Sequence, residues 1–161
     1  MSAWLLEFGN ADDLRGLVRL DVREGQSHAS FWTYLTGLSG HEGIVAVRDD
    51  EVPPPRQGLE LRGDGIWAEL MCETPGEHWT FGLEAFGIRI DHLTDEMGDR
   101  IPVGLDLEWE VTIAGPPAGT VHGEILVGRD RFAFEGGGTF LEGCAPAPDD
   151  GLPERWLTRG R

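Results

Sequence analysis

The stretch LDLEWEVTI, residues 105–113, alternates apolar and polar side chains without a break. Successive side chains of a β-strand point to opposite faces, so one face of this segment is apolar and the other is polar. The apolar row is Leu105, Leu107, Trp109, Val111 and Ile113, and the polar row is Asp106, Glu108, Glu110 and Thr112. This pattern is typical of an antiparallel strand with one face on a core and one in solvent.

The same alternation recurs along most of the chain. It predicts further strands at 14–22, 29–35, 44–47, 59–62, 66–72, 78–90, 121–127, 131–134 and 139–141. Within 78–90 the apolar parity changes, which predicts a bulge or a bend at Gly87. The glycines 136–138 predict a kink before the last strand. With 24 glycines, 10 prolines and no long amphipathic helix pattern, the sequence predicts an all-β fold.

Strands of this number favour an antiparallel, lipocalin-like barrel of about 8–10 strands, with a β-sandwich as the alternative. The length of 161 residues fits one domain. We expect a single β-barrel domain at 1–143 and a C-terminal tail rich in proline and aspartate at 144–161.

The charge of the chain bounds its partners and its compartment. The net charge is −16, and all 13 basic residues are arginine. A surface of this sign disfavours nucleic acid and anionic membranes. The arginine bias indicates a bacterial source. Without a signal-peptide pattern we expect a cytoplasmic protein, in which Cys72 and Cys144 are free thiols.

Candidate catalytic residues are few. Nucleophile-elbow, phosphate-loop and dinucleotide motifs are absent from the sequence, so no cofactor is expected. His78 and Glu84 share one face of a predicted strand, and His122 and Glu124 share one face of another. These four residues are the candidates for acid–base catalysis. Their spacing matches no known metal site, so no metal is expected. The alternative is that strand carboxylates such as Glu108 only form a solvated row.

Aromatic residues predict the binding site of an apolar ligand. They are Trp32, Trp67, Trp79, Phe81, Phe86, Trp109, Phe132 and Phe134. We expect these rings to face the barrel interior, where they would line a cavity. The equally weighted alternative is that they fill a solid core, as side chains do in many small barrels.

Four segments carry a resemblance to a known family. Residues 65–75, 78–87, 100–110 and 121–127 resemble the first barrel of the tandem lipocalin-like proteins of the hydroxyneurosporene synthase (carotenoid 1,2-hydratase) and AttH group. The resemblance covers 59–134. It implies a calycin-like barrel that encloses an apolar small molecule, with hydration or cyclisation of polyenes and polyketides among the activities.

Two departures limit what the resemblance implies. The members of that group carry two barrels, and their first barrel ends in an Asp-x-Ser-Trp-Gly type of segment that residues 134–143 lack. Catalytic residues are therefore not carried over there. A lone barrel would dimerise to recreate the paired arrangement, so a homodimer is expected.

Together these features predict a barrel that binds a hydrophobic small molecule of secondary metabolism. A cofactor-independent cyclase, isomerase or hydratase would act mainly by folding its substrate against aromatic walls. The alternative is a non-catalytic interaction or assembly module that homodimerises through a strand edge or an apolar patch.

Overall fold

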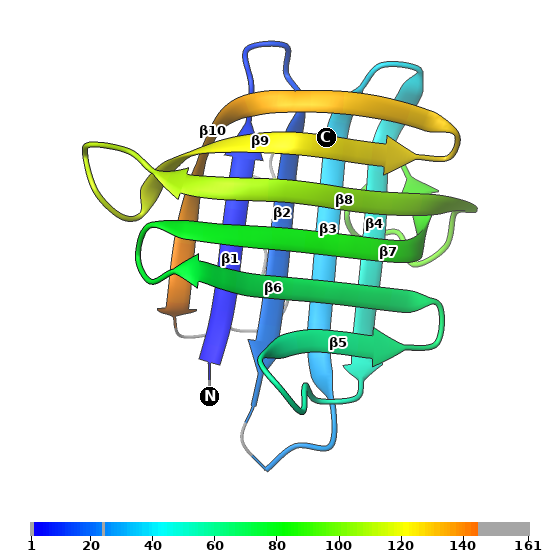
Figure 1. The fold of residues 1–161 in the computed structure, drawn as a ribbon. Coiled ribbons are helices and arrows are strands. Elements are labelled where there is room, and N and C mark those ends of the chain that lie inside the picture. Colours follow the sequence, from blue (N-terminus) through cyan, green and yellow to red (C-terminus); the bar gives the residue numbers. More distant parts are fainter. Residues whose placement is uncertain (1, 24, 145–161) are drawn as a thin grey trace.

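The computed structural model describes residues 2–23 and 25–144, which form ten antiparallel strands in one sheet (Figure 1). The strands are β1 Ser2–Gly9, β2 Arg15–Val22, β3 Ala29–Leu38, β4 His41–Val52, β5 Leu59–Gly63, β6 Ile66–Thr74, β7 His78–Ile90, β8 Asp99–Val111, β9 Ala118–Val127 and β10 Asp130–Cys144. No helix that could cross a bilayer occurs in this described part. The prediction of an all-β, barrel-like fold is confirmed.

The strands close into a ring of eight, with two more attached. The order around the ring is β1, β2, β3, β4, β7, β8, β9 and β10, and β10 pairs with β1. Between β4 and β7 only three residue pairs join the ring, from Ile44–Ile90 to Ala46–Ile88. β6 pairs with the first part of β7 and carries β5. Figure 1 shows the result as two crossing layers, β1–β4 behind β5–β10.

β10 belongs to both layers. Its residues 130–139 pair with β9, and its residues 137–144 pair with β1. The predicted kink at glycines 136–138 falls at this change of partner, and Figure 1 shows the strand bending there. A Cβ at Gly136 would lie 2.3 Å from the carbonyl oxygen of Gly9, so the bend needs a residue without a side chain. The predicted tail lies outside the described residues apart from Cys144, which ends β10.

A polar chain of three side chains supports the short β4–β7 junction. Arg89 Nη2 donates to His41 Nδ1 at 2.9 Å, and His41 Nε2 lies 2.7 Å from a carboxylate oxygen of Asp130. Because arginine can only donate, His41 Nδ1 accepts and Nε2 carries the proton toward Asp130. These three hydrogen-bonded side chains connect β4, β7 and the start of β10, where few backbone pairs join the strands.

The interior of the barrel is packed with side chains. Phe140 is 4% exposed, with its ring centroid 4.9 Å from that of Trp79, 5.2 Å from Phe81 and 5.4 Å from Trp109. These rings sit at the separations of favourable edge and tilted contacts. Aliphatic residues from the other seven strands of the ring complete the same core.

Three local predictions are wrong. The sequence pattern did not predict β1, although Leu6 and Phe8 are buried in the core. Ile113 does not point inward, because β8 ends at Val111 and Ile113 is fully exposed in the following turn. Of the two alternatives predicted at Gly87, the bulge does not occur in the pairing with β8, since β7 and β8 pair in continuous register through it.

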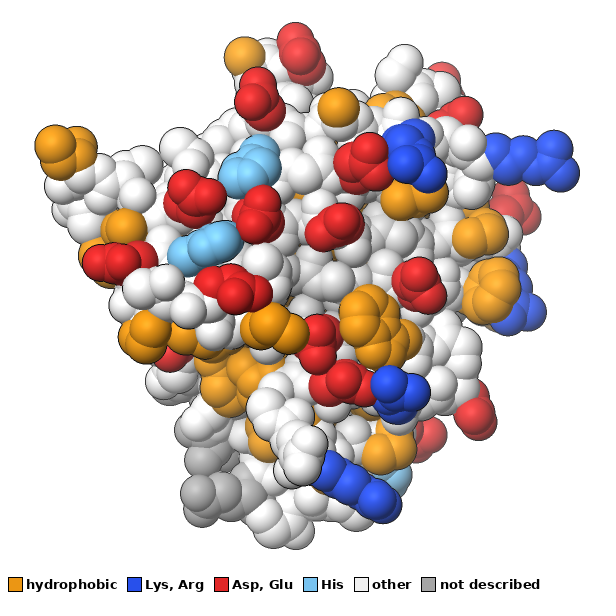
Figure 2. All heavy atoms as spheres, viewed as in Figure 1, with side chains coloured by type: hydrophobic (Ala, Val, Ile, Leu, Met, Phe, Trp, Pro, Cys, Tyr) orange, Lys and Arg blue, Asp and Glu red, His pale blue; other side chains and the backbone are white. Residues whose placement is uncertain are grey.

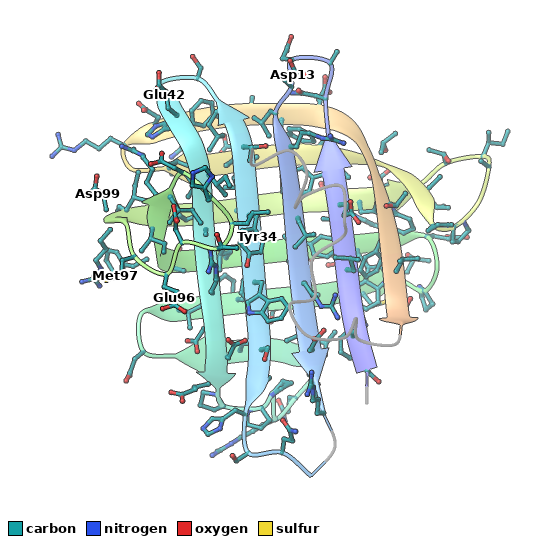
Figure 3. All side chains as sticks on the ribbon, turned by 180° about the vertical axis from the view of Figure 1, so that it is seen from behind. Asp13, Tyr34, Glu42, Glu96, Met97 and Asp99 are labelled. Carbon is teal, nitrogen blue, oxygen red and sulfur yellow. The ribbon has the colours of Figure 1, made fainter. Side chains whose placement is uncertain are left out.

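The change of parity in β7 has another cause, a second apolar cluster outside the barrel. This outer cluster consists of Leu17, Tyr34, Ile44, Ala46, Ile90 and Leu93. Ile90 is apolar because it faces this cluster, which Leu93 of the 91–98 segment covers. Figure 3 shows Tyr34 on this outer side and the segment with Glu96 and Met97 beside β4. Arg48 Nη2 donates to the Leu93 carbonyl at 2.9 Å and holds the segment in place.

Asp95 organises the same segment. Its carboxylate accepts hydrogen bonds from the amides of His92, at 2.9 Å, and Asp91, at 3.1 Å. These bonds, that of His92 first, lower the pKa of Asp95 below its ordinary value of 3.8. Stabilisation of this kind is complete above the ordinary pKa and is lost as the pH falls through the lowered one.

We therefore expect Asp95→Ala to speed hydrogen exchange of the Asp91 and His92 amides at neutral pH, because those amides lose their acceptor. In the unmodified protein the same amides should lose protection only below pH 3.8. Glu96→Ala is the matched control, since Glu96 is exposed in the same segment. Equal exchange in the two variants would contradict the role of Asp95.

Candidate functional site

The outer face of strands β6–β9 carries a groove of about 770 Å³. Gly82 of β7 and Gly104 of β8 form part of its lining, beside the apolar side chains of Trp67, Phe86 and Leu126. Small-molecule sites commonly have volumes of roughly 300–1,000 Å³ and apolar walls with a few polar groups. The size and lining of this groove therefore suit a small molecule.

The groove exists because two outward positions lack side chains. Gly82 and Gly104 both point to the outer face, where a larger residue would fill the space between neighbouring side chains. A Cβ on Gly82 would lie 3.0 Å from the end of the Trp67 indole, so the indole occupies the space above this glycine. Trp67 is half-buried as a result and forms a flat apolar platform.

Carboxylates line the groove together with the Trp67 indole. Glu84, Asp106 and Glu124 all line the groove. Glu124 forms an ion pair with Arg131 at 3.1 Å, whereas Glu84 and Asp106 have no ion pair or hydrogen bond with another described side chain. The groove thus combines an apolar floor with uncompensated negative charge.

A cluster of two histidines and one glutamate adjoins the groove, and Figure 2 shows histidine side chains among carboxylates on this face. The Nε2 atom of His78 lies 3.1 Å from one carboxylate oxygen of Glu108, and the Nε2 atom of His122 lies 2.8 Å from the other. His122 and Glu108 are directly paired across β8 and β9, and His78 comes from β7. The cluster lies one side-chain row from Asp106 and Glu124, about 7 Å along each strand.

The geometry of the cluster fixes which nitrogens can act. An ionised carboxylate accepts hydrogen bonds, so each neutral imidazole donates its Nε2 proton to Glu108 and keeps Nδ1 as an acceptor. Neither Nδ1 atom has a described hydrogen-bond partner. An oriented imidazole of this kind can accept a proton from a bound molecule. The described residues contain no group of three side chains arranged to hold a metal ion.

The four predicted catalytic residues all lie on this outer face, and they form two groups. His78 and His122 share Glu108, while Glu84 and Glu124 border the groove. None of the four is buried in an apolar cavity. The polar pattern of β8 predicted Glu108 only as one of a solvated row, because its contacts depend on the pairing of three strands. Asp106, Gly82 and Gly104 were not predicted as site residues.

The eight predicted ligand-binding aromatics divide between the core and the surface. Trp79, Phe81, Trp109 and Phe134 are buried in the core, and Phe132 packs against it. Three predicted interior residues face outward instead, and for these the prediction is wrong. Phe86 is 52% exposed, Trp67 lines the groove, and Trp32 packs on the outer cluster with its Nε1 donating to Asp50 at 2.8 Å.

A second groove, of about 570 Å³, lies where β10 bends. Its lining is mainly glycine backbone and polar side chains, including Glu7, Asp13 and Arg15. Phe8 is its one aromatic residue, and that ring is buried in the core. This corner offers an apolar molecule little contact area, so the groove beside Trp67 is the stronger candidate.

The fold and the site define an antiparallel, barrel-like protein with a packed interior and a groove on its outer face. Comparison with known protein families, with curated proteins and with solved structures finds no match to the chain. The resemblance to the hydroxyneurosporene synthase and AttH group therefore stays a prediction.

Proposed function

We propose that this protein binds a small molecule with an apolar body, and that the molecule lies in the outer groove beside Trp67. The observation that carries the proposal is the groove whose lining includes Gly82 and Gly104 and which is bordered by an indole, a phenyl ring and a leucine. Aromatic faces at such a site supply large contact areas at a small loss of side-chain entropy.

The packing of the interior supports the outer location. Inside the barrel, Phe140 already contacts the rings of Trp79, Phe81 and Trp109. A ligand placed among these rings would have to displace side chains, because protein interiors are closely packed. In the outer groove the Trp67 indole lies over Gly82 and Leu126 lies beside Gly104, and both are side chains that can change rotamer.

The substitution Gly104→Val tests the proposal by filling the groove. A Cβ at Gly104 meets Leu126 atoms at 3.4 Å and the Leu83 carbonyl at 3.5 Å, which are ordinary contacts. Valine also favours strands, so the variant should fold. We expect it to weaken binding by at least about tenfold, equivalent to about 1.4 kcal/mol.

The measurement is isothermal titration calorimetry with three probes that share a naphthalene body: 2-naphthylmethanol, 2-naphthylmethylammonium and 2-naphthoate. Thr120→Val is the control, because Thr120 is exposed on the same face of β9 outside the groove. If no probe binds the unmodified protein, or if Gly104→Val binds as well as Thr120→Val, the proposed function is wrong.

A further inference from the structure

We propose that the outer groove selects a small organic cation, an ammonium group on an apolar body, over a neutral or anionic molecule of the same shape. The inference rests on the proposed function and names the chemistry of its ligand. It follows from the charges around the groove, from the partners of the nearby arginines and from the aromatic floor.

Two of the three carboxylates that line the groove have no ion-pair partner in the described structure. Glu84 and Asp106 stand on adjacent strands on either side of the two floor glycines, and neither has an ion-pair partner among the described side chains. Glu69 lies opposite Gly82 on β6. Partial burial, and then the negative charge of Glu60, raises the pKa of Glu69 above its ordinary value of 4.5. A cation bound here would relieve the repulsion among these groups.

Three arginines near the groove contact other side chains of the chain. Arg131 pairs with Glu124 at 3.1 Å, and Arg62 pairs with Glu60 on β5. The guanidinium carbon of Arg100 lies 4.0 Å from the centroid of the Phe86 ring. No basic side chain lines the groove itself, so an anionic ligand there would meet at least two unpaired carboxylates.

The aromatic side chains that line the groove can bind a cation. The face of an indole attracts ammonium groups more strongly than any other side-chain ring. Arg100 over Phe86 shows that a ring at the groove already holds a cation of this chain. Trp67 is half-buried and has no cation over its ring among the described contacts, so its face is open to one supplied by a ligand.

The net charge of the chain acts in the same direction. At −16 the molecule attracts cations over a distance of about one Debye length and repels anions. Long-range attraction of this kind raises the rate at which an oppositely charged ligand arrives. It does not by itself localise the ligand, so the test must separate the groove from the overall field.

The three naphthalene probes provide that test. We expect 2-naphthylmethylammonium to bind about tenfold or more tightly than 2-naphthylmethanol, because an ion within a few ångström of a partly exposed carboxylate gains about that much. 2-Naphthoate should bind more weakly than the alcohol. The preference for the cation should shrink as sodium chloride is raised from about 0.05 to about 0.5 M, since salt screens exposed charges.

Variants that each remove one negative charge show which carboxylates cause the preference for the ammonium probe. Asp106→Asn and Glu84→Gln keep the shape of the groove, and each should reduce the ratio of ammonium to alcohol affinity by about threefold or more. Glu110→Gln is the matched control, because Glu110 is exposed on β8 outside the groove and the substitution changes the net charge equally. Its ratio should stay within error of that of the unmodified protein.

The outcomes separate this inference from the proposed function. If the alcohol binds as tightly as the ammonium probe and Gly104→Val weakens both, the groove binds small molecules but does not select cations, and the inference is overturned. An equal loss of preference in Asp106→Asn and Glu110→Gln would also overturn it, because the overall field would then be the cause. Absence of binding by every probe overturns the proposed function and the inference together.

Discussion

Replacing Phe140 by alanine is expected to lower the free energy of unfolding by about 3–5 kcal/mol. Phe140 is 4% exposed and contacts Trp79, Phe81 and Trp109, which come from the front layer, while its own strand continues into pairing with β1. Its removal would leave a cavity between three large rings, and rings of this size cannot close it without leaving their rotamers. Urea unfolding followed by circular dichroism gives the measurement.

The neighbouring residue supplies the control for Phe140. Leu141 points to the opposite face of β10 and is 42% exposed, so Leu141→Ala should change stability by no more than about 1 kcal/mol. A loss below about 1.5 kcal/mol for Phe140→Ala would mean that the centre of the barrel is loosely packed. The packing of the interior would then no longer exclude a ligand site inside the barrel.

Gly123→Ala is expected to be similarly severe, with a loss of about 3 kcal/mol or more, or no folded protein. Gly123 has a φ of +145°, which side-chain-bearing residues rarely adopt. A Cβ there would lie 1.9 Å from the carbonyl oxygen of Asp106 on the paired strand. Backbone has no rotamer to change, so β9 would have to move away from β8.

The position of Gly123 connects this prediction to the site. Gly123 lies between His122 and Glu124, which face outward from β9 toward the histidine cluster and the groove. Movement of β9 should therefore shift the His122 imidazole resonances even in a variant that remains folded. Gly104→Ala is the control: a Cβ at Gly104 has ordinary contacts, so thermal unfolding should differ from the unmodified protein by only a few degrees. Comparable stability of the two variants would contradict the strain assigned to Gly123.

The fold was predictable wherever alternation and turn residues agreed. β8 is the clearest example, since Leu105, Leu107 and Trp109 all face the core as the pattern predicts. β1 was missed because Trp4 and Leu5 place two large apolar side chains on adjacent positions, which hides the period of two. Ile113 was assigned inward because its parity fits, but parity does not show where pairing ends.

The site was predictable only in part. His78 and Glu84 were singled out as a pair on one face of a predicted strand, and His122 and Glu124 as a pair on another, and all four lie on one face. Glu108 could not be singled out, because its role depends on one residue from each of two other strands. Trp67, Trp32 and Phe86 were placed inside because large aromatic residues are usually buried, yet here they cover glycine hollows and outer clusters.

The sequence by itself determined the strand class, the two-faced character of most strands and the acidic outer surface, because these properties follow from residue type and a spacing of two along the chain. Only the tertiary structure decided that aromatic side chains pack together in the interior, that Glu108 joins His78 to His122, and that Gly82 and Gly104 line one groove, with the Trp67 indole above Gly82. The reason is register. Which side chains become neighbours across strands depends on how far each strand is shifted against the next, and local alternation does not encode that shift.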